Sequence, residues 1–278
     1  IRVNNPQGVS PLTAKIRYFS AMTSSAAAIT HLVAALVTDE VSLSELGQAG
    51  DVFRAANGAA RATSPVYEVV VCAPVLGSVR SREGYDLQVP GGLDTVMRAD
   101  TVLLPGCWPV DVPPEPDVLD AVRTAHSHGA RIVATCTGVS VAAAAGLLDG
   151  RTATTHWRHA EIFARAHPRV LLQPDVLYLD HGDVATSAGT SAGLDLYLHL
   201  VRRDHGAEVA AAVARRLISP RQRDGGQPQL LPDPQPQRQD ELTALLEVSH
   251  GAPARSGTGR RGGEAHGAER THPAPPLP

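Results

Sequence analysis

The chain has 278 residues, a formal net charge of −3 and only 4% aromatic residues. This charge balance excludes an overall basic surface for nucleic acid, and no apolar run reaches the roughly 20 residues that a membrane span needs. The three cysteines, Cys72, Cys107 and Cys136, show no C-x-x-C spacing, which argues against a disulfide framework or a zinc site and favours the reducing cytoplasm.

Three parts of the chain differ in composition. Residues 1–30 are expected to form a poorly ordered leader, whereas 31–222 carry the patterned apolar segments of one domain. Residues 223–278 contain eight glycines, nine prolines and no aromatic residue, so we expect a disordered tail. The Gly- and Arg-rich stretch 255–263 is typical of a shifted reading frame in GC-rich DNA, and we hypothesise a frameshifted or truncated gene.

The first half of the domain predicts strands that alternate with helices. Continuous apolar runs of strand length occur at 31–38, 66–72 and 101–106. The spacing of apolar residues predicts a helix at 42–56, and the turn-rich stretch 77–84 indicates a short hairpin. Buried strands that alternate with helices are typical of a parallel sheet covered on both faces.

The second half continues this pattern. A helix is predicted at 116–128, a strand at 131–135 and a helix at 139–148. Further elements are expected as a helix at 157–166, short strands at 170–172, 176–179 and 183–187, and helices at 191–203 and 207–217. The predicted fold class is therefore α/β, a three-layer, flavodoxin-like sandwich with a mainly parallel sheet, in which sites lie at the carboxyl ends of strands.

Cys136 stands where the predicted strand 131–135 runs into the alanine-rich helix 139–148. A side chain at such a turn is held over the sheet edge, and the first N–H groups of the helix point toward the same place. The helix dipole favours thiolate, so we expect an acidified, reactive Cys136. Ala134 and Gly138 flank it as small residues flank the serine of a nucleophile elbow. The alternative is a buried structural cysteine.

Four separated segments resemble the ThiJ/PfpI superfamily, which is class I glutamine amidotransferase-like. They are Leu103–Cys107, Ala134–Val139, Ala145–Trp157 and Thr186–Asp195. More narrowly, they resemble the amino-terminal domain of GlxA-type AraC-family transcriptional regulators and the related isonitrile hydratases. The resemblance extends over roughly residues 30–230 and implies an α/β sandwich with its site at Cys136.

The resemblance implies that Cys136 works with an acidic residue after the first strand and with a histidine about twenty residues later. Glu45 and His156 stand at these positions. A protonated carboxyl close to Cys136 would hydrogen-bond the sulfur, and His156 would act as its acid–base partner. Taken alone, Glu45 fits a solvated surface charge equally well, and His156 fits a cap of the following helix.

Backbone N–H groups near Cys136 are expected to form an oxyanion or ligand pocket. The donors are Gly106 or Cys107 on one side and Thr137, next to Gly138, on the other. Cys107 replaces the second glycine that is common in the family's P-G-G loop, which makes this pocket bulkier. The histidines and carboxylates show no metal-ligand pattern, so we expect neither a metal nor another cofactor.

The resemblance leads to competing functions. In the first, the domain senses a small molecule, forms a homodimer and passes the signal to a DNA-binding module. No paired helices with a turn glycine are predicted after Gln229, so we expect DNA binding only if a helix-turn-helix domain is restored. In the second, the chain is a stand-alone cysteine enzyme, such as an isonitrile hydratase-like lyase or an amidohydrolase. In a third, Cys136 oxidises reversibly to a sulfenic acid and senses redox state.

Overall fold

The computed structural model describes residues 30–229, apart from positions 61, 63, 108, 111, 220 and 221. Its central sheet consists of β1 (His31–Leu36), β2 (Tyr67–Cys72), β5 (Thr101–Leu104), β6 (Arg131–Thr135), β9 (Tyr178–Asp180) and β10 (Val184–Ser187). The strand order is β2-β1-β5-β6-β10-β9, and only β9 runs antiparallel to its neighbour. Two small sheets pair β3 (Gly77–Arg80) with β4 (Asp86–Val89) and β7 (Thr152–Ala153) with β8 (Leu171–Leu172).

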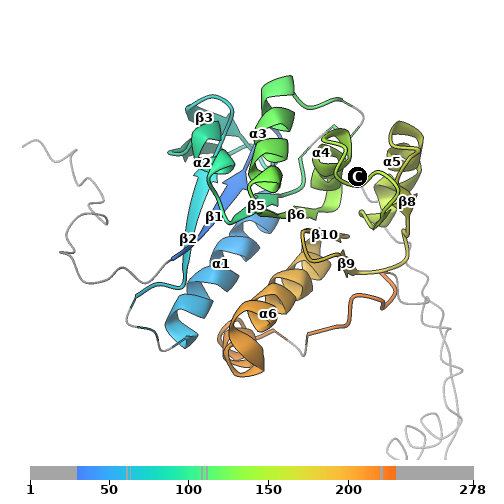
Figure 1. The fold of residues 1–278 in the computed structure, drawn as a ribbon. Coiled ribbons are helices and arrows are strands. Elements are labelled where there is room, and N and C mark those ends of the chain that lie inside the picture. The colour runs from blue at the N-terminus through green and yellow to red at the C-terminus, as the bar shows by residue number, and fades with distance from the viewer. Residues whose placement is uncertain are drawn as a thin grey trace, which may run out of the picture. The chain divides into compact units, whose positions relative to one another are not determined.

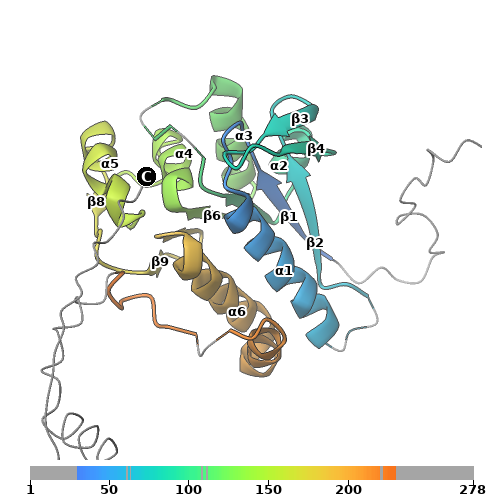
Figure 2. The same cartoon turned by 180° about the vertical axis from the view of Figure 1, so that it is seen from behind.

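Helices cover both faces of the central sheet. They are α1 (Leu43–Ala59), α2 (Leu93–Met97), α3 (Pro116–Ser127), α4 (Val139–Ala144), α5 (Ala160–Ala166) and α6 (Thr190–Arg216). Figures 1 and 2 show α1 and α6 together on one face, with α2, α3 and α4 on the other. The predicted three-layer α/β sandwich is confirmed. None of the helices in the described residues has the length and apolar character to cross a membrane.

The two faces of the sheet have separate apolar cores because side chains alternate along each strand. In β1, Ala34 and Leu36 pack in the core under α2, α3 and α4, whereas Val33 and Ala35 pack in the core with α1 and α6. All four residues are at most 5% exposed. Burial on both faces explains why these strands appear in the sequence as continuous apolar runs.

Some predicted element boundaries differ from the structure. The helix expected at 139–148 ends at Ala144, and Gly146, with a φ of 79°, follows in the left-handed conformation that terminates helices. The two helices expected at 191–203 and 207–217 are present as the two parts of α6, which the non-helical residue Gly206 separates. The short helix α2 was not predicted.

The domain boundary expected at residue 222 falls inside a segment that packs against the domain. The N–H of Leu177 donates to the carbonyl of Gly225 at 2.8 Å, and the N–H of Arg223 donates to Asp195 Oδ1 at 2.9 Å. Residues 223–229 of the expected tail are thus part of the fold. Residues 1–29 of the leader expected at 1–30, and the rest of the tail with its hypothesised frameshift, lie outside the described residues.

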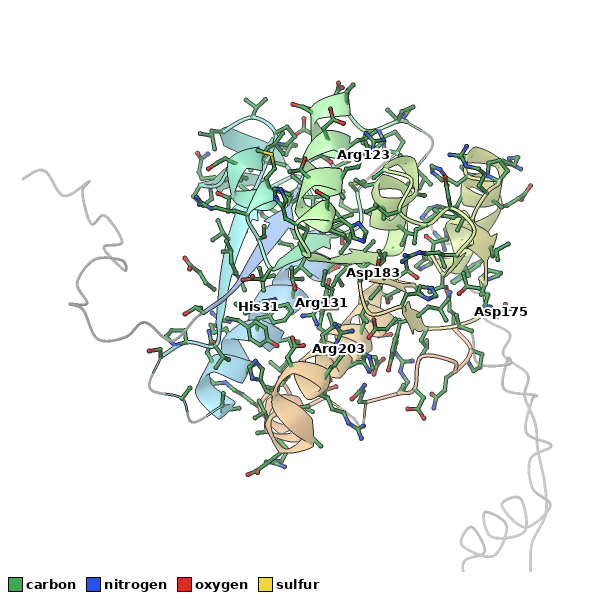
Figure 3. All side chains as sticks on the ribbon, viewed as in Figure 1. His31, Arg123, Arg131, Asp175, Asp183 and Arg203 are labelled. Atoms are coloured by element: carbon green, nitrogen blue, oxygen red, sulfur yellow. The ribbon has the colours of Figure 1, made fainter. Side chains whose placement is uncertain are left out.

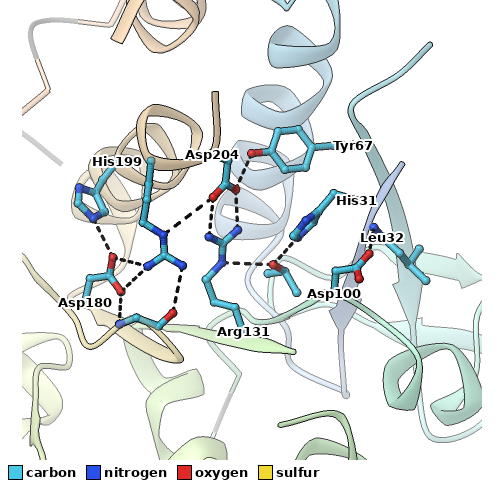
Figure 4. Close-up of polar contacts among 11 residues, drawn as sticks. His31, Leu32, Tyr67, Asp100, Arg131, Asp180, His199 and Asp204 are labelled. Atoms are coloured by element: carbon cyan, nitrogen blue, oxygen red, sulfur yellow. Dashed lines mark hydrogen bonds and ion pairs between the residues drawn. The ribbon is translucent and has the colours of Figure 1, made fainter. Parts of the chain in front are cut away.

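A partly buried polar cluster lies at the end of the sheet where the parallel strands begin. Arg131 starts β6 and donates hydrogen bonds of 2.9 and 2.8 Å to the two carboxylate oxygens of Asp204 in α6. Tyr67 also donates to Asp204, at 2.7 Å, as Figure 4 shows. Figure 3 labels Arg131 and His31 at these strand starts. The cluster joins the sheet to α6. It lies at the end opposite the carboxyl ends of the parallel strands, where a site is expected.

Candidate functional site

Cys136 lies at the carboxyl edge of the sheet, where β6 turns into the one-turn 3₁₀ helix Cys136–Gly138 that precedes α4. Its φ is 53°, in the left-handed region that a residue with a side chain seldom adopts. Such strained residues are concentrated at functional sites. The residue is also only 7% exposed. The structure therefore places Cys136 at the expected strand-to-helix turn. It also buries the residue, as expected for a structural cysteine.

Two glycines allow neighbouring segments to approach this turn closely. A Cβ atom at Gly138 would overlap the carbonyl oxygen of Leu104 at the end of β5. Gly189, with a φ of 77°, lies directly against Cys136, and a Cβ there would stand 2.5 Å from Glu45 Oε1. Gly138 was predicted as a site residue, whereas Gly189 was not, although it lies in the segment Thr186–Asp195 that carries the family resemblance. The role of Gly189 depends on a contact between segments far apart in the sequence.

Glu45 is the buried carboxyl of the site. It projects from α1 and is 2% exposed. Oε2 accepts hydrogen bonds from the Gly106 N–H at 2.8 Å and from Thr135 Oγ1 at 2.6 Å, and Oε1 accepts one from the Thr190 N–H at 3.2 Å. The Cys136 thiol lies near this carboxylate, whose negative charge raises the pKa of the thiol. Glu45 is thus a buried, hydrogen-bonded carboxyl near Cys136 and not a solvated surface charge. Thr135 and Thr190 were missed because sequence spacing does not show which hydroxyls and N–H groups meet.

The surroundings of Cys136 oppose ionisation of its thiol. Burial is the main cause that raises the pKa of Cys136, and the negative charge of Glu45 raises it further, against a smaller lowering by the Thr137 N–H. The expected acidification by the helix dipole was wrong. Helix α4 has only six residues, so its dipole is weak, while desolvation and a neighbouring carboxylate both favour the neutral thiol.

One of the N–H groups expected to form an oxyanion pocket is already used inside the site, because Gly106 donates to Glu45. The N–H of Thr137 faces the thiol of Cys136 and slightly lowers its pKa. The Thr137 hydroxyl donates to the carbonyl of Cys107. These contacts join the loop after β5 to the turn at Cys136, and they correct the assignment of Gly106 as a free oxyanion donor.

A cavity of about 450 Å³ lies beside this cluster. It is lined by loop residues that follow three strands, Thr38, Ala73 and Cys107, and by Val118 of α3 and Val141 of α4. Cys107 rather than Cys136 lies on its wall, and burial raises the pKa of the Cys107 thiol. Clefts of this size at the carboxyl ends of parallel strands are typical small-molecule sites.

His156 lies in the loop that follows β7 and is half-buried. Its Nδ1 accepts a hydrogen bond from the Arg158 N–H at 3.2 Å, and its ring stacks on Trp157 at a centroid distance of 5.8 Å. Burial, and then the charge of Arg158, lower the pKa of His156, and Glu45 opposes this effect. Within the described chain it makes no hydrogen bond to Cys136 or Glu45. The capping alternative is therefore what the structure shows.

The backbone near His156 is nevertheless connected to Cys136. The hydroxyl of Thr155 donates to the carbonyl of Cys136 at 2.6 Å. Thr154 and Thr155 are both fully buried. Among the residues that the structure describes, no group of three His, Cys, Asp or Glu side chains is arranged to hold a metal ion.

Comparison with known proteins gives one family and several regulators. The model of the DJ-1/PfpI family matches residues 31–203. The HTH-type transcriptional regulator GbdR of Pseudomonas aeruginosa is 30% identical over 177 residues, which cover 62% of this chain and 48% of GbdR. GlxA of Rhizobium meliloti, also an HTH-type transcriptional regulator, is 31% identical over 188 residues, 64% of this chain and 55% of GlxA. The chain thus spans about half the length of these regulators.

An enzyme and solved structures also match. Isonitrile hydratase of Pseudomonas putida is 30% identical over 142 residues, half of this chain and 60% of that enzyme. The crystal structure of an AraC family transcriptional regulator from Pseudomonas putida matches with a TM-score of 0.59 and 22% identity, over 67% of this chain and 99% of that chain. DJ-1beta of Drosophila melanogaster matches with a TM-score of 0.58 and 20% identity, over 69% of this chain and the whole of that chain. At these identities the structures establish the shared fold.

Proposed function

Because the chain belongs to the DJ-1/PfpI family, we propose that it is the small-molecule-sensing domain of a GlxA-type AraC-family transcriptional regulator. The observation that carries this proposal is the cavity beside the Glu45–Cys136 pair, in a domain that aligns with HTH-type regulators. In the proposed regulator this domain acts in the cytoplasm and forms a homodimer, and its bound ligand controls a DNA-binding module.

The environment of the site suits binding better than nucleophilic attack. Burial and Glu45 raise the pKa of Cys136, so its nucleophilic thiolate form is disfavoured near neutral pH. The cavity instead has apolar walls, such as Val118 and Val141, and polar groups from Thr38 and Cys107. Apolar walls with a few polar groups are typical of sites that bind small organic molecules. A ligand there would contact α3, α4 and the ends of three strands at once.

A thermal-shift screen with small organic metabolites tests the sensing function. A ligand of the folded state raises the melting temperature by mass action. Ser78 is an exposed residue of the cavity wall, and Ser78→Trp should abolish the shift by filling the cavity. Ser127→Trp, at an exposed position at the end of α3, is the matched control and should retain it. A screen without any stabilising compound, or equal shifts in all three proteins, would argue against the proposal.

A cysteine enzyme is the second candidate, because the thiol of Cys136 lies near the buried carboxylate of Glu45 and an isonitrile hydratase is among the relatives. Its reaction would add water across the isonitrile carbon to give an N-substituted formamide. Incubation with an alkyl isonitrile, followed by NMR of the formamide proton, measures this turnover. Turnover that disappears in Cys136→Ala would favour the enzyme, whereas its absence from the wild-type protein would favour the sensor.

A further inference from the structure

Gln229 lies near the end of the described chain. Both the nitrogen and the oxygen of its side-chain amide make hydrogen bonds to the loop that carries His156. Its Nε2 is 3.1 Å from Thr154 Oγ1, 2.9 Å from the Thr155 carbonyl oxygen and 3.0 Å from the Val176 carbonyl oxygen. Its Oε1 accepts a hydrogen bond from the Trp157 N–H at 3.0 Å. One side chain thus contacts both sides of His156 along the backbone.

Thr155 connects this amide to the turn at Cys136. Its carbonyl accepts the hydrogen bond from Gln229, and its hydroxyl donates to the Cys136 carbonyl at 2.6 Å. Thr155 is fully buried, so water does not compete for either bond. A displacement of the Cys136 backbone must therefore lengthen a buried hydrogen bond or move Thr155, and with it Gln229.

The segment 222–229, which we call the C-terminal strap, is attached independently at its other end. Arg223 donates to Asp195 of α6 through its N–H at 2.9 Å and through Nε at 2.8 Å. Gly225 lies so close to Tyr178 of β9 that a Cβ there would stand 2.9 Å from the ring. The Gln229 N–H donates to the carbonyl of Asp175, which Figure 3 labels, at 2.8 Å. The strap therefore bridges α6 and the loops beside the site.

We propose that the C-terminal strap receives and transmits structural changes that occur at Cys136. Gln229 is the residue that positions the loop of the site relative to the strap. Gln229 holds the loop with His156 in place, and a change at Cys136 reaches the strap through Thr155. As a signalling step the inference rests on the proposed sensing function, but the coupling itself requires no ligand. Coupling between two sites is reciprocal, so loosening the strap must also loosen Cys136.

The first experiment compares Gln229→Ala with Gln227→Ala by the rate at which iodoacetamide alkylates Cys136, followed by peptide mass spectrometry. Gln227 is a matched control because it is the same residue type on the same strap with an exposed side chain. We expect alkylation roughly tenfold faster in Gln229→Ala, since buried hydrogen bonds that restrict opening are lost, and within about twofold of wild type in Gln227→Ala. Equal rates in the two variants would overturn the proposal.

NMR titration of His156 separates positioning from general destabilisation. Burial lowers the pKa of His156, so a loosened loop should let this pKa rise toward its ordinary value in Gln229→Ala. Gln227→Ala should leave it unchanged. If Gln229→Ala does not fold, Gln229→Glu retains an acceptor for the Trp157 N–H while removing the donors, and the same two measurements apply. An unchanged His156 pKa would contradict the positioning role.

The reverse experiment measures transmission from the site to the strap. Carboxamidomethylation of Cys136 should accelerate hydrogen exchange of the Gln229 and Tyr178 amides severalfold in wild type, and less in Gln229→Ala, where the link is already broken. Unchanged exchange after alkylation would refute the inference. Failure of the metabolite screen together with accelerated exchange would reject the sensing function and leave the coupling intact, so the two failures are distinguishable.

Discussion

Cys136 and Glu45 show at the residue scale how burial overrides a local electrostatic effect. The turn after β6 gives the thiol the position of a nucleophile, with a φ of 53°. The neighbouring carboxylate and the loss of water then raise the pKa of the thiol, whereas a short helix alone would lower it. Burial is thus the main cause that raises the pKa of Cys136, and Glu45, which lies 91 positions earlier in the chain, raises it further.

Glu45→Gln should lower the pKa of Cys136, because the substitution removes a negative charge beside the thiol. The pH at which iodoacetamide alkylation reaches half its maximal rate should fall, and alkylation at pH 7 should become faster. Asp51→Asn is the matched control, since Asp51 is an exposed carboxylate on the same helix. An unchanged or higher midpoint in Glu45→Gln would show that Glu45 does not act on the thiol through its charge.

Two glycine substitutions should have opposite effects on stability. Gly138→Ala should lower the free energy of unfolding by at least about 2 kcal/mol, because the new Cβ would overlap the Leu104 carbonyl oxygen in a packed core. Gly50→Ala in α1 should raise it by about 0.5–1 kcal/mol, since open space surrounds this helical glycine and alanine favours the helix. Urea denaturation measures both, and a mild effect of Gly138→Ala would contradict the close packing at Cys136.

At the scale of elements, α6 has the break that the sequence predicts between two helices. The break lies at Gly206, whose φ of 87° and ψ of 170° are not helical. These angles are accessible essentially only to glycine. The kink separates the turns before Gly206 from those up to Arg216, and both parts contribute to the core that contains α1, for example through Leu196 and Val213.

Gly206→Ala should destabilise the protein by about 1–3 kcal/mol through its backbone conformation alone. An added Cβ at Gly206 has no atom within 4 Å, so steric overlap does not contribute. Gly47→Ala in α1 has equally open surroundings and helical angles, and it serves as the control that should not destabilise. Equal unfolding free energies for the two variants would show that the kink is not required for the fold.

For the whole molecule, the cluster of Arg131, Asp204 and Tyr67 joins the sheet to α6 at the end opposite the site. Burial would raise the pKa of Asp204, but the Arg131 hydrogen bonds and charge outweigh it, so this pKa lies below its ordinary value. The stabilisation is therefore complete above the ordinary carboxyl pKa of about 4 and is lost as the pH falls through the lowered value.

Asp204→Asn should lower the free energy of unfolding by about 3 kcal/mol at pH 7, because it leaves a buried Arg131 without its ion-pair partner. It should also flatten the decrease in stability between pH 5 and 2, where the wild type loses the Asp204 contribution. Urea titrations at several pH values give both quantities. Asp94→Asn, on an exposed carboxylate, is the control. Parallel pH profiles for wild type and Asp204→Asn would contradict the assignment.

The sequence by itself determined the layered α/β architecture of this protein and identified two residues of its candidate site, Cys136 and Glu45. Strands buried on both faces must be apolar throughout, and helices must be amphipathic, so alternating patterns predict the α/β sandwich. The motif that contains Cys136 and the acidic position at Glu45 are local enough to be found through resemblance. The family model that confirms the assignment matches residues 31–203, which contain these motifs.

Only the tertiary structure decided the environment and connections of that site. The raised pKa of Cys136, the use of the Gly106 N–H by Glu45, and the link from Gln229 through Thr155 all join residues distant in sequence. Local patterns determine which conformation a segment adopts, but burial and hydrogen-bond partners depend on which segments the folded chain places in contact. A thiol that the sequence predicted to be acidified is buried in the folded protein, and this burial raises its pKa.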